Sequence, residues 1–145
     1  MIADTLENAQ LEGRAPWDNV EINTREFVVF RDAYPVTEGH ILIVPREATQ
    51  ENIMKCFNFG VTMGYDNVIS DKTNITGYNM GINMGESAGQ TCMYPHVHLI
   101  FRRDGDVIDP TGGVRNVIPS KGNYKIPQDV RNYAEHCAHQ QRFDF

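Results

Sequence analysis

The sequence predicts an α+β fold, with an antiparallel sheet and flanking helices. Runs of β-forming residues are joined by short turns, and stretches with helical spacing of apolar residues lie outside those runs. The chain has 145 residues, of which 41% are hydrophobic and 22% charged, which is an ordinary globular composition. This length buries a core without disulfides or metals. We therefore expect a single domain over residues 1–145.

The first half of the chain predicts a hairpin and a helix. Residues 1–23 have no convincing hydrophobic period and are expected to form an N-terminal lead-in. Residues 26–30 and 40–44 are rich in β-formers, and the turn residues between them predict a hairpin. Thr49 is a candidate helix cap, followed by apolar residues at the helical spacing of positions 53, 54 and 57. Glycines 60 and 64 are expected to interrupt this helix.

The second half predicts two further strands. They cover residues 77–83 and 95–101 and are separated by a glycine-rich loop over residues 84–89. Pro127 lies where a helix would begin, which predicts a C-terminal helix over residues 126–140.

Charge and cysteine content narrow the function classes. The net charge of -6 offers no broad basic face, so we expect no nucleic-acid partner. The first residues do not resemble a signal peptide and no apolar run has membrane-spanning length, so we expect no membrane association. The three cysteines include no Cys-x-x-Cys pair and are interpreted as reduced thiols. We therefore expect a cytoplasmic protein.

Two histidines, His96 and His98, alternate on a predicted strand. Their side chains should share one face with Tyr94, because strand residues two apart point the same way. The pattern alone leaves three alternatives open, namely catalysis, a metal pair and structural histidines. Just before this strand, residues 87–91 offer backbone N–H groups, an amide and a hydroxyl that suit a phosphate oxygen. A plain hairpin connection is the other interpretation of that loop.

Several ordered blocks resemble the histidine-triad (HIT) family of hydrolases and nucleotidyl transferases. The blocks cover residues 30–45, 77–91 and 96–100, and the tail at 105–106 and 112–119 resembles a bacterial and archaeal branch. The resemblance implies a HIT-like antiparallel sheet. It also implies cleavage at the α-phosphate of dinucleoside polyphosphates or nucleotide phosphoramidates, through a covalent nucleotidyl-histidine.

The resemblance also assigns roles to residues. His96 matches the nucleophile, His98 the third triad histidine and His40 a fourth histidine beside them. Asp32 matches the position that holds ribose hydroxyls, and Asn83, Gln90 and Thr91 match positions near the phosphates, where Gly89 is also expected. Apart from the resemblance, Phe30 is a candidate to flank the base, although an apolar residue in a hairpin is also consistent with the core.

One position departs from the family pattern, because Tyr94 replaces the first triad histidine. A related branch with Pro-His-x-His attacks with its second histidine, which would be His98, but the spacing from Gly89 favours His96. Tyrosine does not take up and release a proton near pH 7 as an imidazole does, so we expect Tyr94→His to keep the fold and raise turnover.

The leading expectation is a nucleotide hydrolase or transferase that needs no metal or cofactor and, by the resemblance alone, forms a homodimer. One alternative is a nucleotide-binding or sensing module with reduced turnover, motivated by Tyr94. The other is a metal-dependent phosphodiesterase with zinc held by His40, His96 and His98.

Overall fold

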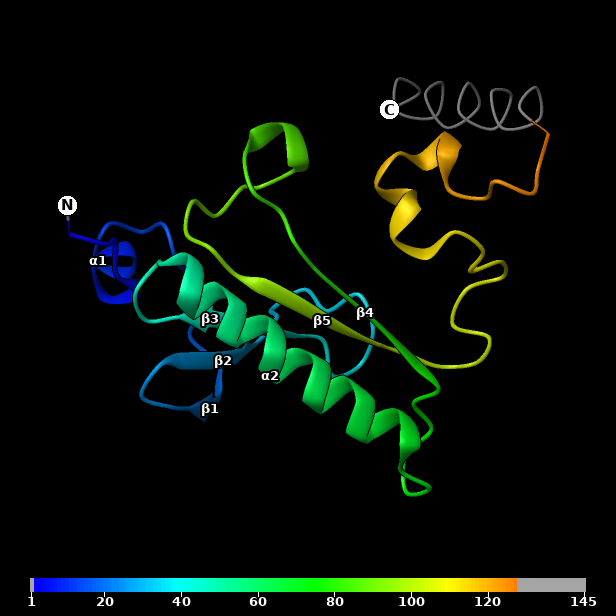
Figure 1. Ribbon diagram of the computed structural model, residues 1–145, viewed down its shortest axis with the longest axis horizontal. Coiled ribbons are helices and arrows are strands. Elements are labelled where there is room, and N and C mark those ends of the chain that lie inside the picture. Colours follow the sequence, from blue (N-terminus) through cyan, green and yellow to red (C-terminus); the bar gives the residue numbers. More distant parts are fainter. Residues whose placement is uncertain (1, 128–145) are drawn as a thin grey trace. The chain divides into compact units, whose positions relative to one another are not determined.

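The computed structural model describes residues 2–127 (Figure 1). The chain divides into two compact units, one ending at Asp106 and the other beginning at Val107. Within the described residues, the first unit contains a five-stranded antiparallel sheet in the order β1-β2-β3-β5-β4, with helices α1 and α2. The predicted α+β class with an antiparallel sheet is confirmed. A single domain over residues 1–145 stays a prediction.

All four predicted strands are present, and each begins within two residues of its expected start. The hairpin of β2 and β3 and the pair of β4 and β5 were both predicted, whereas β1 was not, since it lies within the expected lead-in. The bounds are β1 Val20–Asn23, β2 Phe27–Arg31, β3 Ile41–Pro45, β4 Gly77–Ile82 and β5 Val97–Arg102.

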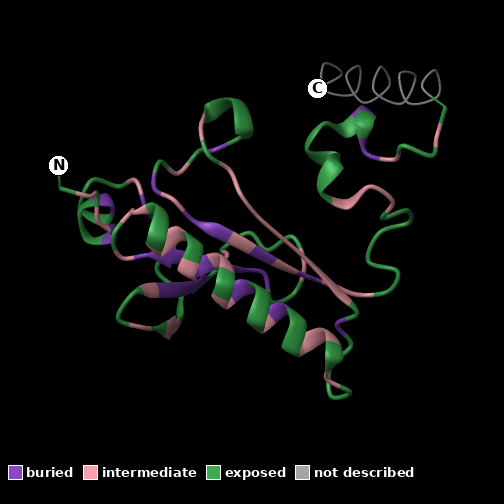
Figure 2. Cartoon of the chain, viewed as in Figure 1, coloured by how far each residue is buried: buried purple, intermediate pink, exposed green. Residues whose placement is uncertain are grey.

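Each face of the sheet has its own apolar cluster. One face packs against α2 (Gln50–Ile69) through alternate strand residues such as Ile43 and Leu99. The other face carries Leu42 and Val44 and is covered by residues that precede β1. Figure 2 shows the buried residues concentrated along the central strands. The sheet thus has a helix face and a second face, on which the candidate site lies.

Helix α2 is continuous over 20 residues, so the predicted interruption by glycines is wrong. Its predicted cap is confirmed, because the Thr49 side chain accepts a hydrogen bond from the Asn52 backbone N–H at 3.1 Å. A Cβ at Gly60 would lie 2.5 Å from Met80 Sδ, and one at Gly64 would lie 2.8 Å from the Tyr78 ring. The glycines therefore let the helix approach β4 closely. Met54, expected on the buried face, is instead exposed.

The lead-in has more structure than its sequence predicts. Residues 4–17, here called the N-terminal segment, include the short helix α1 (Leu6–Leu11), capped by the Thr5 side chain. The backbone N–H of Leu6 donates to the Arg46 carbonyl at 2.9 Å, which fixes the segment just beyond β3. Leu6, Ala9 and Ala15 are buried against the second face of the sheet.

The second unit is described over residues 107–127. It contains two short 3-10 helices, η2 (Gly113–Val117) and η3 (Pro119–Lys121). Arg115 donates to the carbonyl of Gly122 and lies over the Tyr124 ring, 5.5 Å from its centroid. The predicted helix over residues 126–140 falls, from residue 128 on, outside the described residues. Among those described, no helix is both long and apolar enough to cross a membrane.

Candidate active site

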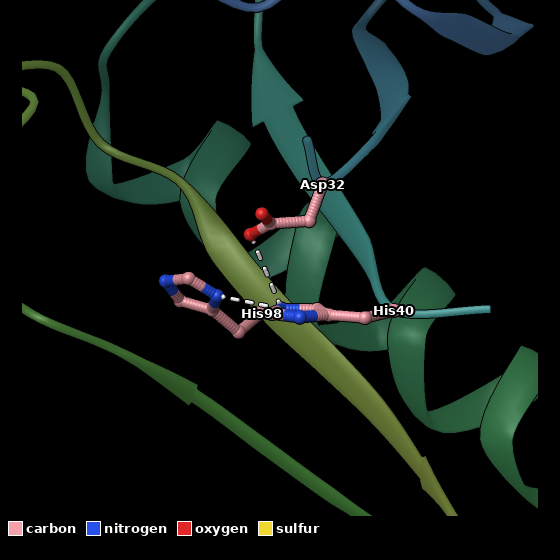
Figure 3. A group of neighbouring side chains, drawn as sticks. All are labelled: Asp32, His40 and His98. Atoms are coloured by element: carbon pink, nitrogen blue, oxygen red, sulfur yellow. Dashed lines mark hydrogen bonds and ion pairs between the residues drawn. The ribbon is translucent and has the colours of Figure 1, made fainter. Parts of the chain in front are cut away.

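Asp32, His40 and His98 come together from three neighbouring strands (Figure 3). Asp32 follows β2, His40 precedes β3, and His98 lies in β5 opposite Leu42, on the second face of the sheet. The Nε2 atom of His40 is 3.0 Å from Nδ1 of His98 and 3.5 Å from Oδ2 of Asp32. Three residues predicted for the site, from two separate sequence blocks, therefore form one cluster.

The hydrogen bonds of this cluster assign its protons. The backbone N–H of Val36 donates to Nδ1 of His40 at 3.1 Å, so that nitrogen carries no proton. Neutral His40 then has its proton on Nε2, which donates to Nδ1 of His98. His98 must in turn carry its own proton on Nε2. In the neutral state, His98 is therefore a donor at the nitrogen that points away from His40.

His96 has the opposite tautomer. Its Nδ1 lies 2.7 Å from the backbone carbonyl of Tyr94, which can only accept, so the proton is on Nδ1. Its Nε2 therefore keeps a lone pair. The ring is 5.1 Å from that of His98, between centroids, and His96 is only 7% exposed. An acceptor on His96 and a donor on His98 thus lie side by side.

Burial keeps all three imidazoles neutral near pH 7. Loss of solvation lowers the pKa of His40 and of His96, in each case partly offset by the negative charge of Asp32. The pKa of His98 is lowered to about 4, first by burial and then by the neighbouring His96 and His40. A neutral imidazole is the form required of a nucleophile.

The turn between β2 and β3 positions two of these side chains. Asp32 Oδ1 accepts from the Tyr34 backbone N–H at 2.8 Å, an Asx turn that directs Oδ2 to His40. Gly39 has a φ of 88°, a conformation that favours glycine. The Thr37 hydroxyl donates to the Phe101 carbonyl, which ties the turn to β5.

Of the site residues predicted in and around the glycine-rich loop, one is used to hold the loop together and two have polar side chains that remain available. The Gln90 amide is already used, since it accepts from the Gly85 backbone N–H and donates to the Cys92 carbonyl. Gln90 therefore braces the loop rather than offering its amide to a phosphate. Thr91 is exposed and Asn83 half-buried, and neither side chain has a hydrogen-bond partner within residues 2–127. Gly89, at φ 91°, closes the 3-10 turn η1 (Glu86–Ala88).

Two predicted site residues depart from their expected roles. Tyr94 shares the face of the histidines, but it is fully buried and its hydroxyl donates to the Pro45 carbonyl at 2.6 Å. It cannot reach a leaving group from there. Phe30 is 2% exposed in the same apolar cluster, which leaves no open ring face for a base. Both are core residues, because the N-terminal segment covers them.

Sequence reasoning missed Trp17. Its half-buried indole lies 4.6 Å from the His96 ring and 6.0 Å from the Phe30 ring, between centroids. Its position in a stretch without periodicity carried no local signal. Only the fold brings it to the site, because it and His96 are far apart in the chain.

The donor atoms of Asp32, His40 and His98 lie within 4.8 Å of one another, which is close enough for a metal ion to contact all three. A metal would need the Nε2 lone pair of His40, whose other nitrogen would then have to carry a proton. A histidine that binds a metal normally donates from that second nitrogen. Here it accepts from the Val36 N–H, so the cluster does not fit a metal ion.

Comparison with known proteins places this arrangement in a family. The chain is 30% identical over 106 residues to AP-4-A phosphorylase of Mycobacterium tuberculosis, covering 68% of this chain and 50% of that protein. It is 30% identical over 99 residues to the nitrilase and fragile histidine triad fusion protein of Caenorhabditis elegans, covering 65% and 22% respectively. The chain thus spans half or less of the length of these two curated relatives.

Solved structures agree on the fold. A zinc-bound histidine triad family protein from Mycobacterium smegmatis superposes with a TM-score of 0.57 at 26% identity, over 73% of this chain and 80% of that one. A hypothetical histidine triad nucleotide-binding protein from Sulfolobus tokodaii superposes with a TM-score of 0.51 at 26% identity, over 67% of this chain and 68% of that one. The HIT domain profile matches residues 17–105, from Trp17 through the whole histidine cluster, and the chain therefore belongs to the HIT domain family.

Proposed function

We propose that this chain is a nucleotide hydrolase or nucleotidyl transferase that cleaves at the α-phosphate of dinucleoside polyphosphates or nucleotide phosphoramidates, with His96 as nucleophile. The observation that carries the proposal is the pair of opposite tautomers, with a lone pair on His96 Nε2 and a proton on His98 Nε2. The names of relatives support the substrate class, since they include an AP-4-A phosphorylase and a bis(5'-nucleosyl)-tetraphosphatase of Schizosaccharomyces pombe.

In this mechanism the lone pair of His96 Nε2 attacks the α-phosphorus. A phosphorus–nitrogen bond forms, and the bond from phosphorus to the leaving group breaks with its electron pair on that group. The carbonyl of Tyr94 accepts from Nδ1 and stabilises the positive charge that the ring gains. The Nε2–H of His98 donates to a phosphate oxygen. Water, or another acceptor in a transferase, then displaces the histidine.

The remaining polar groups suit the rest of the nucleotide. We assign Asp32 to the ribose hydroxyls, because its half-buried carboxylate lies just after the end of β2, beside His40. Thr91 and Asn83 are assigned to the phosphates, and Gly89 to the turn that presents them. Gln90 acts indirectly by bracing this loop.

One observation favours a second candidate, a nucleotide-binding or sensing module with slow turnover. Position 94 carries a tyrosine in place of the first triad histidine, and its buried hydroxyl is engaged with the Pro45 carbonyl, so this position does not assist the leaving group. Tight nucleotide binding without product would identify this case. The metal-dependent phosphodiesterase is opposed by the bond from Val36 to His40, and activity lost on chelation and restored by zinc would revive it.

The test is direct detection of the covalent intermediate. Enzyme mixed with an adenosine dinucleotide or phosphoramidate is quenched without acid, digested and mapped by mass spectrometry. A nucleoside monophosphate should be found on the peptide that contains residues 94–101. His96→Asn should abolish the adduct while keeping a side-chain N–H that can reach the Tyr94 carbonyl.

The matched variant is His98→Asn, which keeps an acceptor for His40 and should slow the adduct without moving it. An adduct that survives in His96→Asn and disappears in His98→Asn would make His98 the nucleophile. Absence of any adduct, together with hydrolysis that a chelator stops, would leave the metal-dependent alternative standing.

Three further features are part of the proposal. A homodimer is proposed by family resemblance, and light scattering of the purified chain tests it. A cytoplasmic location is proposed from the reduced thiols, of which Cys56 and Cys92 are free among the described residues. We also propose that the chain belongs to a bacterial and archaeal branch of the family, with Tyr94 in place of the first triad histidine.

A further inference from the structure

We propose that Trp17 is a positioning residue for His96, because its indole holds the imidazole in the orientation that presents Nε2 to a phosphate. This inference rests on the proposed function, since it concerns the support of the proposed nucleophile. Trp17 lies outside the histidine motifs, and neither its residue type nor its neighbours in the sequence indicated a role.

The ring of His96 is held by a hydrogen bond at one edge and by packing. The bond from Nδ1 to the Tyr94 carbonyl fixes one ring atom at 2.7 Å. The second side-chain torsion of histidine has a broad energy profile of its own, so the orientation of the ring depends on such contacts. Trp17, 4.6 Å away and tilted by 53°, occupies space into which the ring would turn. The two contacts together restrain the direction of Nε2.

Trp17 itself is firmly supported. Its indole packs against the buried Phe30 ring. It ends the N-terminal segment, and Arg14 of that segment donates to the Met93 carbonyl at 2.9 Å and to Asp4 at 2.8 Å. Met93 immediately precedes Tyr94, whose carbonyl holds His96. The same segment therefore anchors both groups that restrain the nucleophile.

The indole also shields His96 from water. Burial lowers the pKa of His96, while the Tyr94 carbonyl and the charge of Asp32 act in the opposite direction, and neutral His98 lies beside it. Loss of the shield would let water reach the ring. If Trp17 positions His96, its removal should change both the tautomer and the titration midpoint of His96. If Trp17 only packs in the core, its removal should lower stability without changing the tautomer.

The test compares Trp17→Leu with the conservative Trp17→Phe. The matched control is Phe59→Leu, which removes a half-buried aromatic partner of Phe27, at 4.8 Å, on the α2 face of the sheet. Long-range ¹H–¹⁵N spectra of the full chain report the tautomer and titration midpoint of His96 without any turnover. Adduct formation at saturating nucleotide gives the second readout.

In Trp17→Leu we expect a mixture of His96 tautomers, a titration midpoint closer to that of ordinary histidine, and adduct formation about tenfold to a hundredfold slower, as for modest misplacement of a reacting group. Trp17→Phe should recover most of both readouts. Phe59→Leu should change neither.

An unchanged His96 tautomer and midpoint in Trp17→Leu, with adduct formation within about twofold of wild type, would overturn the proposal. The proposed function fails separately. A wild-type chain that forms no adduct, but whose His96 tautomer responds to Trp17→Leu, would confirm the positioning contact and remove the covalent mechanism.

Discussion

Acidification should expose how strongly the fold depends on neutral His98. Its pKa is about 4 in the folded chain, against 6.5 for an ordinary histidine. Below pH 6.5 the unfolded chain takes up a proton at this position that the folded chain refuses. The free energy of unfolding is therefore unaffected by this titration above pH 6.5, and it decreases as the pH falls from 6.5 towards 4. One pKa unit corresponds to about 1.4 kcal/mol, so the upper bound is roughly 3 kcal/mol. Because the side chain is only partly buried, we expect about 2 kcal/mol.

The assay is urea unfolding of the wild type and His98→Asn at a series of pH values from 7.5 to 4. The difference in unfolding free energy between the two proteins cancels the shared titration of carboxylates. That difference should shift by about 2 kcal/mol against the wild type across the series. A difference that stays constant within about 0.5 kcal/mol would refute the assignment of His98 as a half-buried, neutral donor.

Four further predictions concern individual residues. Gly64→Ala should destabilise the chain by about 1–3 kcal/mol, because the new methyl group would overlap the rigid Tyr78 ring, and this outweighs the better helix propensity of alanine. Gly60→Ala should cost less, because its methyl group would meet the flexible side chain of Met80. Thermal unfolding of the two variants compares them, and equal losses would contradict the close approach of α2. Tyr94→Phe should cost about 1–3 kcal/mol by leaving a buried carbonyl unsatisfied. Tyr94→His should likewise lower the unfolding free energy and should not raise turnover. A histidine variant that is as stable as the wild type and turns over faster would support the expectation from the sequence. Asp32→Ala should weaken AMP binding by about 1.5–3 kcal/mol, whereas calorimetry with unchanged affinity would remove it from the site.

The strands and the histidine cluster could be predicted because their signals are local. β-Forming runs bounded by turn residues gave four strands, and alternation correctly placed His98 of β5 on the same face as His96, which immediately precedes that strand. The nearness of His40 to His98 followed from the family resemblance, and the structure shows them in contact.

The errors arose where long-range packing overrides local preference. Gly60 and Gly64 disfavour a helix locally, yet they are needed because β4 lies so close to α2. Helix α1 and strand β1 are too short to show a hydrophobic period. Tyr94 occupies a motif position, and no sequence pattern shows that the N-terminal segment buries it.

The N-terminal segment is part of the folded core, yet most of it lies before the residues that match the family. The HIT domain profile begins at Trp17, whereas α1 and Arg14 lie before it. A fragment cut at the limits of that profile would retain every histidine discussed here. It would also uncover the apolar surface around Phe30, Leu42 and Tyr94, which the segment covers in the full chain. The match to the family therefore ends short of residues that bury one face of the sheet, and a stable protein has to include the N-terminal segment as well as the matched residues.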